Sequence, residues 1–204
     1  MAVTGAGAFE AVVLAAGTGS RFGGGKLLAP HAGGVLLDAA LAAAFAAPVG
    51  KVIVVTGADG EAVAAAVRAS PAVDDRLQLV HAADHAEGMG ASLRRAAAEL
   101  GPGCAGLFVF LGDMPRIPHA VFAPLAEAVR AGAPAAAPVF RGQRGHPALI
   151  GAALLPGLAT LTGDAGARAV LKDLGDRLAL VEAPDDGVLF DVDEPGDLDR
   201  IQGR

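Results

Sequence analysis

Short apolar segments alternate with longer alanine-rich segments through the first two thirds of the chain, and this alternation restricts the possible folds. The apolar segments are typical of buried strands, and they are residues 11–16, 51–55, 77–81 and 107–111. The longer segments are typical of helices, and they are residues 35–47, 61–69, 91–100 and 118–131. Such alternation predicts βαβ units, and therefore a three-layer α/β fold with a doubly wound, mainly parallel sheet.

The rest of the chain is less regular but continues the same architecture. The segments that we interpret as strands are residues 135–140, a short piece that ends at 150, 178–182 and 189–192. The segments that we interpret as helices are residues 152–159, 164–174 and a final one that starts at Pro195. No repeat, linker or block of charge marks a boundary, so we predict one domain over residues 1–204.

Composition excludes several classes of function. The net charge is −6, and the chain has no tryptophan or tyrosine, which argues against a protein that holds long nucleic acids. No segment approaches the roughly 18 apolar residues of a membrane span, and residues 1–9 do not resemble a signal peptide. The single cysteine, Cys104, excludes an internal disulfide. We therefore expect a cytoplasmic protein with no membrane or nucleic-acid partner.

A glycine-rich loop follows the first predicted strand and suits an anion. Glycines at 17, 19 and 23–25 let backbone N–H groups approach a ligand, and Arg21 and Lys26 supply positive charge. A Walker loop needs a hydroxyl after its lysine, and here Leu27 follows. The dinucleotide-binding pattern needs a third glycine where Phe22 stands. The loop therefore indicates phosphate binding of another kind.

Carboxylates at the ends of later strands are candidate metal ligands. Asp113 follows the strand at 107–111, where a carboxylate can bind Mg²⁺ that also contacts phosphates, although a cap for the helix near Pro118 is an alternative. Asp191 and Asp193 alternate along an extended segment and point to opposite faces, so only one of them easily faces the same metal.

Six motifs occur in order along nearly the whole chain. They are Leu14-Ala15-Ala16-Gly17-x-Gly19-x-Arg21-Phe22-Gly23 with Lys26, Gly88-Met89-x-x-Ser92-Leu93, Gly112-Asp113-Met114-Pro115, Arg144-Gly145-His146-Pro147, Gly163-Asp164-x-Gly166-x-Arg168 and Asp191-Val192-Asp193-x-Pro195-x-Asp197-Leu198. This set resembles the signature of the molybdopterin-guanylyltransferase-like nucleotidyltransferases, a superfamily with a Rossmann-like fold. The closest resemblance within it is to the molybdenum cofactor cytidylyltransferases.

The resemblance implies an activity and a set of site residues. The activity is Mg²⁺-dependent transfer of CMP from CTP to the terminal phosphate of a molybdopterin-type cofactor, with release of pyrophosphate and with a molybdoenzyme or chaperone as a possible partner. Arg21 and Lys26 would be catalytic, and Asp113 and Asp193 would hold the metal. The implied nucleotide-binding residues are Leu14, Ala15, Ala16, Gly17, Gly19, Arg21, Lys26, Gly88, Ser92 and Asp113, and the implied acceptor-binding residues are His146, Asp164 and Arg168.

Alternatives remain for the function and for single residues. The acceptor could be another phosphorylated molecule that receives CMP or GMP, and some look-alikes are NAD(P)H-dependent reductases or non-catalytic binding modules. Ser92 could cap a helix, Asp164 and Arg168 could pair with each other, and His146 could be a structural loop residue. His85 also stands where the family commonly has a tryptophan, which bears on the acceptor.

Overall fold

The computed structural model describes residues 7–164 and 166–202. An eight-stranded sheet forms its middle layer, in the order β10-β7-β9-β6-β1-β4-β5, with β8 paired to β7. The strands are β1 (Phe9–Ala15), β4 (Val49–Thr56), β5 (Leu77–His81), β6 (Gly106–Leu111), β7 (Ala135–Phe140), β8 (Gln143–Arg144), β9 (Ala148–Gly151) and β10 (Leu178–Glu182). A separate two-stranded sheet pairs β2 (Pro30–His31) with β3 (Gly34–Val35).

The central strand is β1, which pairs in parallel with β4 on one side and β6 on the other. After β1 the chain builds β4 and β5 outward, then crosses back to β6, so the strand order reverses beside β1. The strand β9 runs antiparallel to both β6 and β7, which makes the sheet mixed but mainly parallel. The predicted doubly wound α/β fold is confirmed, and its switch point lies at the carboxyl end of β1.

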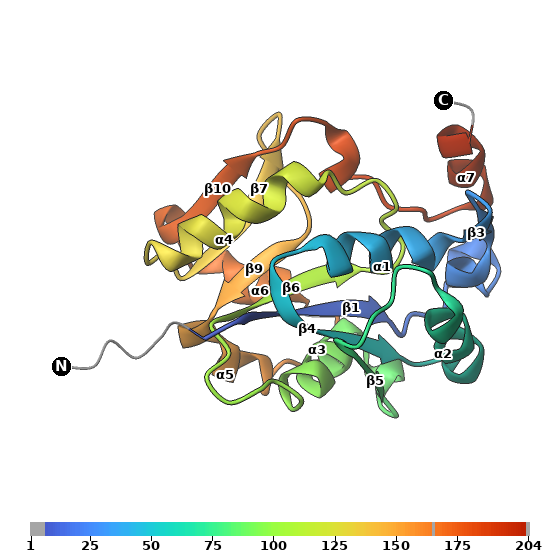
Figure 1. Cartoon of the computed structure of the whole chain (residues 1–204), viewed down its shortest axis with the longest axis horizontal. Coiled ribbons are helices and arrows are strands. Elements are labelled where there is room, and N and C mark those ends of the chain that lie inside the picture. The colour runs from blue at the N-terminus through green and yellow to red at the C-terminus, as the bar shows by residue number, and fades with distance from the viewer. Residues whose placement is uncertain (1–6, 165, 203–204) are drawn as a thin grey trace.

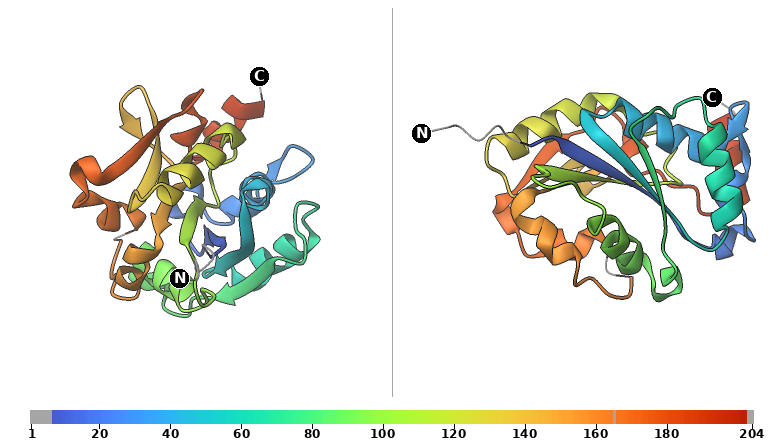
Figure 2. Two further views of the ribbon diagram at one scale, coloured as in Figure 1. Left: turned by 60° about the vertical axis from the view of Figure 1, so that its left-hand side comes forward. Right: turned by 60° about the horizontal axis from the view of Figure 1, so that its bottom comes forward.

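Helices cover both faces of the sheet (Figures 1 and 2). Helices α1 (Leu36–Ala46) and α4 (Phe122–Arg130) cover one face, and α2 (Gly60–Ala69) packs against α1. The other face is covered by α3 (Met89–Ala97), α5 (Leu155–Leu158) and α6 (Ala167–Lys172). The last helix, α7 (Pro195–Gln202), lies beside β3 near the carboxyl ends of the parallel strands (Figure 1). No helix in the described part of the chain is long and apolar enough to cross a membrane.

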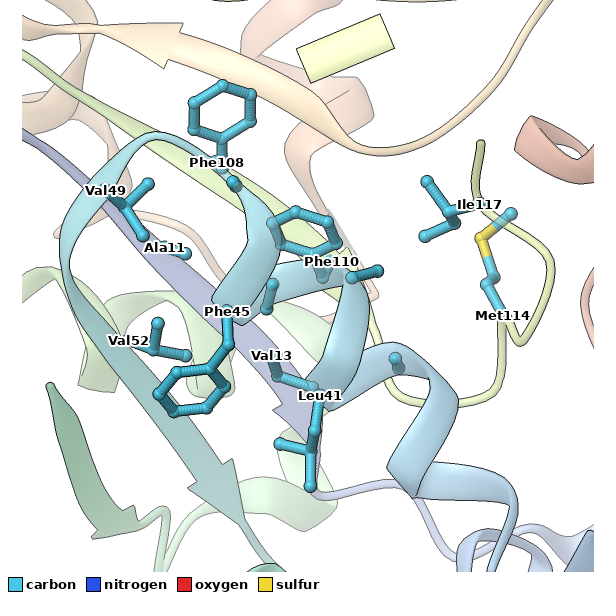
Figure 3. Packing of buried hydrophobic residues seen from close by; sticks show 14 of the residues in the cluster. Ala11, Val13, Leu41, Phe45, Val49, Val52, Phe108, Phe110, Met114 and Ile117 are labelled. Atoms are coloured by element: carbon cyan, nitrogen blue, oxygen red, sulfur yellow. The ribbon is translucent and has the colours of Figure 1, made fainter. Parts of the chain in front are cut away.

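The larger hydrophobic cluster lies between the sheet and α1 with α4. Figure 3 shows Leu41 and Phe45 of α1 close to Val13 and Val52 of the sheet. Ala40 is fully buried on the same helix, and its small side chain lets the helix lie close to the strands. Burial of each large apolar side chain stabilises the fold by about 1.5–3 kcal/mol. The alanine-rich sequence of α1 therefore suits a closely packed layer.

One predicted strand is wrong: residues 189–192 form no part of the sheet. A 3₁₀ turn at Asp186–Val188 precedes them, and the N–H group of Val192 donates to the carbonyl oxygen of Asp113 at 3.0 Å. The side chain of Val192 is buried with Leu36 and Leu198. The apolar alternation here reflects packing against α1 and α7, because no neighbouring strand offers a ladder of hydrogen bonds.

The predicted helix over residues 164–174 is shorter than expected, since α6 begins only at Ala167. The N–H group of Gly166 donates to the carbonyl oxygen of Asp164, which makes a tight turn in place of the first helical turn. Asp164 therefore lies before the helix, and its helical spacing from Arg168 is lost.

Candidate functional site

The glycine loop leaves the carboxyl end of β1 and folds over Lys26. Two 3₁₀ turns, Ser20–Phe22 and Lys26–Leu28, shape the loop, and Gly19 has a φ of 57°. A Cβ atom on Gly19 would lie 2.9 Å from Cβ of Lys26, so only glycine allows this approach at its present spacing. The N–H group of Gly24 donates to the carbonyl oxygen of Gly19 at 3.1 Å and closes the loop. The loop thereby fixes Lys26 at its base.

Lys26 links two of the candidate metal ligands. Its Nζ atom lies 2.6 Å from Oδ2 of Asp113 and 3.7 Å from Oδ1 of Asp193. Arg21 makes a second ion pair with Asp193 at 3.0 Å. The side chains of Lys26 and Asp113 are 13% and 22% exposed, whereas that of Arg21 is 76% exposed, so the two ion pairs differ in solvent screening. All four predicted catalytic or metal-binding residues thus lie together.

The alternative role of Asp113 as a helix cap is wrong. The 3₁₀ turn before α4 has Pro118 at its N-cap, and the carboxylate of Asp113 contacts Lys26. Gly112 donates its N–H group to the carbonyl oxygen of Leu14, which ties the start of this turn to β1. The carboxylate is therefore directed towards the glycine loop by the neighbouring strand.

Asp191 and Asp193 are not equivalent. Partial burial raises the pKa of Asp191, and the nearby charges of Asp113 and Asp193 add to this effect. Asp191 is therefore close to the same carboxylates, but the ammonium group of Lys26 contacts Asp193. Among the described residues, no group of three His, Cys, Asp or Glu side chains is placed to hold a metal ion by itself.

Sequence reasoning missed Asp197 as a part of this site. Its Oδ2 atom accepts hydrogen bonds from the backbone N–H groups of Asp193 at 3.0 Å and Glu194 at 2.9 Å. These bonds, from Glu194 first and Asp193 second, lower the pKa of Asp197. The available signal was an acidic residue in the first turn of a helix that begins with Pro195, since such residues reach back to cap the helix. Asp197 holds the backbone from which Asp193 projects.

A cavity of about 390 Å³ opens beside the glycine loop, and we call it the loop cavity. Most of the predicted nucleotide-binding residues line it, except Ala15, which is buried in the core, and Arg21, which stands at the surface. Ser92 is buried in the second turn of α3, where Gly88 is the N-cap, so its alternative role as a cap is wrong. The lining residues are Leu14, Ala16, Gly17, Thr18, Gly19, Lys26, Leu27, His85, Ala86, Gly88, Met89, Ser92, Leu111, Asp113 and Asp164.

Asp164 joins the loop cavity through the start of α3. A Cβ atom on Gly88 would lie 2.5 Å from Oδ1 of Asp164, and the N–H group of Gly90 donates to the carbonyl oxygen of Gly163. Asp164 and Arg168 make no ion pair among the described residues, so the alternative in which they pair is not realised there. The resemblance grouped both with the acceptor, but the structure places them in different cavities.

A second cavity of about 390 Å³, which we call the basic cavity, contains His146 and Arg168. The N–H group of His146 donates to the carbonyl oxygen of Val188 at 2.8 Å, while its Nδ1 atom is buried without a partner among the described residues. Burial lowers the pKa of His146, the backbone of Val109 and the charge of Asp113 oppose this, and Arg168 adds to it. His146 thus lies within the electrostatic influence of both the loop cavity and Arg168.

A larger and more open groove of about 920 Å³ lies over the carboxyl ends of β4 and β5. His85 lines both this groove and the loop cavity. The groove contains neither the glycine loop nor Asp113, so the smaller loop cavity holds the residues that the sequence predicts to bind phosphate.

A glycine loop with a fixed lysine and strand-end aspartates, at the switch point of a doubly wound sheet, defines a nucleotide-binding α/β protein of the nucleotidyltransferase class. Residues 11–178 match the MobA-like NTP transferase domain, and the chain belongs to this family. The predicted superfamily is therefore confirmed.

Individual relatives extend the comparison. Nicotine blue oxidoreductase from Paenarthrobacter nicotinovorans is 33% identical over 202 residues, which cover 93% of this chain and 94% of that protein. The solved Rv0371c homologue from Mycobacterium sp. strain JC1 is 32% identical, with a TM-score of 0.82 over 96% of this chain and 95% of that one. Rv0371c from Mycobacterium tuberculosis H37Rv, solved as a complex with manganese, is 26% identical, with a TM-score of 0.75 over 96% and 98% of the two chains.

Proposed function

We propose that this chain is a Mg²⁺-dependent cytidylyltransferase that transfers CMP from CTP to the terminal phosphate of a molybdopterin-type cofactor. An oxygen of the acceptor phosphate attacks the α-phosphorus of CTP, the bond to the β-phosphate breaks, and pyrophosphate leaves with the bonding electrons. The observation that carries the proposal is the contact of one ammonium group, that of Lys26, with both Asp113 and Asp193 at the glycine loop.

The two carboxylates fit a divalent metal. Because a single cation already contacts both, their oxygen atoms are spaced for a shared positive charge. Two protein carboxylates, with further positions left to water and phosphate, suit Mg²⁺ in such sites. When bound, the metal supplies positive charge to the phosphate oxygens. The manganese complex of the similar Rv0371c supports a divalent cation in this family.

The chain's own residues would mainly position the triphosphate and neutralise its charge. Arg21 and Lys26 are the cations nearest the metal-binding carboxylates, so they would stabilise the negative charge that develops on the leaving pyrophosphate. Backbone N–H groups of the glycine loop would hold phosphate oxygens. Cytidine is favoured by the Ala15-Ala16-Gly17 sequence, which resembles the cytidylyltransferases.

The acceptor would approach from the basic cavity. His146 lies there and is influenced by the charge of Asp113, which supports the acceptor role that the resemblance assigns to His146 and Arg168. Asp164 lines the loop cavity, so its contribution would be to the nucleotide side. A cytoplasmic location and a molybdoenzyme or chaperone partner complete the proposal, and both rest on the resemblance.

A second candidate is an NAD(P)H-dependent reductase, which the 33% identity to nicotine blue oxidoreductase favours. The contacts of Lys26 speak against it. A dinucleotide pyrophosphate bound without a metal needs no carboxylates, and Asp113 and Asp193 would repel it. The reductase also requires a nicotinamide cofactor in a loop that lacks the third glycine of the usual pattern.

Both candidates can be tested on one protein preparation. Pyrophosphate release is measured with CTP, GTP, ATP or UTP, with Mg²⁺ or EDTA, and with or without molybdopterin cofactor, while NADH and NADPH oxidation is followed in parallel. We expect pyrophosphate only with CTP, Mg²⁺ and the cofactor together. Release with CTP and a different phosphorylated acceptor would identify that molecule as the acceptor instead, and NADH or NADPH oxidation without pyrophosphate release would overturn the proposal.

A further inference from the structure

The basic cavity is lined by positively charged side chains, although the chain as a whole is negatively charged. The chain carries 22 acidic against 16 basic side chains, yet the cavity is lined by two arginines, one histidine and no carboxylate. Its lining residues are Ala137, Gly142, Gln143, Arg144, Gly145, His146, Ala148, Ala167, Arg168 and Leu171. Such a cavity attracts anions, because no carboxylate in its lining neutralises the positive charges.

The two arginines come from separate elements and have no internal partner. Arg144 lies on β8, in the hairpin that projects after β7 (Figure 1), and Arg168 lies in the first turn of α6. Neither makes an ion pair or a side-chain hydrogen bond within the described part of the chain. Other arginines of the chain, such as Arg76, Arg94 and Arg116, do pair with carboxylates. The guanidinium groups of Arg144 and Arg168 are therefore available to a ligand.

The basic cavity is distinct from the place where phosphoryl transfer would occur. It shares no lining residue with the loop cavity, which contains Lys26 and Asp113. A phosphate that attacks CTP must lie beside the metal-binding carboxylates, so it cannot also occupy the basic cavity. An anion between Arg144 and Arg168 is then a second group of the bound molecule.

We propose that the Arg144–Arg168 cavity binds a second anionic, oxygen-bearing group of the acceptor, separate from the attacking phosphate. That the bound molecule is the acceptor rests on the proposed transferase function. Binding of an anion in this cavity does not depend on that function. Arginine holds such groups by paired, charge-assisted hydrogen bonds. The site would therefore select acceptors with two anionic ends and orient the attacking end towards Asp113.

Anion binding can be tested without turnover, by NMR titration of the ¹⁵N-labelled protein. The probes are inorganic phosphate and acetate, with chloride at matched ionic strength as the control for general screening. We expect phosphate to shift the backbone signals of residues 142–146 and 167–168 in a saturable manner, and acetate to do so more weakly. The same shifts with chloride, or shifts confined to residues 17–26, would overturn the proposal.

Single substitutions that each remove one positive charge give the matched control. Arg144→Gln and Arg168→Gln should each weaken phosphate binding by about tenfold, since each charge-assisted bond contributes on the order of a tenfold effect. Arg141→Gln removes a charge from the same hairpin, but Arg141 lies over the ring of Phe140 and does not line the cavity. It should leave binding unchanged. Equal weakening by Arg141→Gln would overturn the proposal.

Kinetics separate this proposal from the proposed function. In an active transferase, Arg144→Gln should raise KM for the acceptor by about tenfold and leave KM for CTP unchanged. Phosphate binding in the basic cavity without any transferase activity would support the anion site and contradict the transferase. Transferase activity with unchanged acceptor KM in Arg144→Gln and Arg168→Gln would contradict the anion site alone.

Discussion

Lys26 contacts the oxygen atoms that a metal would use, and this leads to a prediction that is open to direct refutation. Nζ lies 2.6 Å from Asp113 and 3.7 Å from Asp193, so a cation that binds both carboxylates must displace it. In Lys26→Met the side-chain stem remains and the charge is removed. We therefore expect Lys26→Met to bind Mn²⁺ more tightly than the native protein when no nucleotide is present, although it binds the triphosphate more weakly.

The size of this effect follows from the burial of the pair. At an effective dielectric constant of about 20, the Coulomb attraction at these distances is of order 4–6 kcal/mol, but desolvation and side-chain entropy offset most of it. Exposed pairs contribute about 0.2–1 kcal/mol and the breaking of buried ones costs about 3–5 kcal/mol. With exposures of 13% and 22%, the pair of Lys26 with Asp113 lies between these limits. A net value of about 1–3 kcal/mol corresponds to roughly 5- to 150-fold tighter Mn²⁺ binding.

The assay is the loss of the free Mn²⁺ signal in electron paramagnetic resonance, titrated against each variant. Arg21→Met is the matched control, because Arg21 also pairs with Asp193 but is 76% exposed, and removing it should tighten Mn²⁺ binding by less than about fivefold. Unchanged or weaker Mn²⁺ binding in Lys26→Met would refute the reasoning. So would equal effects of the two substitutions, since the argument depends on their difference in burial.

Two further predictions concern residues around the site, and a third concerns Cys104, which precedes the amino end of β6. Asp197→Ala removes the carboxylate that accepts a hydrogen bond from the Asp193 N–H group, and it should weaken metal-dependent triphosphate binding in a thermal-shift titration. Asp197→Asn keeps an oxygen that accepts this hydrogen bond and should retain most of the binding. Equal losses in the two variants would contradict the hydrogen-bonding role. Arg94 donates to the carbonyl oxygen of Leu161 at 2.6 Å and thereby joins the two segments that flank the loop cavity. Arg94→Gln should therefore raise KM for CTP more than it lowers kcat, and an unchanged KM would refute this role. Burial raises the pKa of the Cys104 thiol. Alkylation by iodoacetamide at mildly alkaline pH should therefore be slower in the native than in the urea-unfolded protein, and its rate should increase as the pH rises through the raised pKa. Equal alkylation rates in the two states would contradict this prediction.

Local sequence determined the main helices and strands because the residue patterns that specify them involve only neighbouring residues. Val52 to Val55 form a strand since β-branched side chains pack well on a pleated, buried surface, and the alanine-rich segment after the glycine loop forms α1. The glycines at 17–25 indicated an anion loop because their conformational freedom is a property of the residue itself. The fold class was therefore accessible without a structure, and so was the hypothesis that the loop binds an anion.

Local sequence also misled at two places, and both depend on partners that are distant in the chain. Residues 189–192 alternate as a strand does, but Val192 packs on Leu36 and bonds to the backbone of Asp113. Asp164 and Arg168 have helical spacing, but the helix starts at Ala167 because the chain docks Gly163 against α3. In each case a tertiary contact overrides the local pattern.

The sequence by itself determined which charged residues are candidates for phosphate and metal binding, and only the tertiary structure decided which of them meet. Lys26 lies 87 residues from Asp113, and Arg21 lies 172 residues from Asp193. They come together because β6 pairs with β1 and because the segment after β10 is tied to the end of β6 by Val192. The order of strands in a sheet depends on packing over the whole chain, so no local pattern specifies it. The separation of the loop cavity from the basic cavity has the same origin.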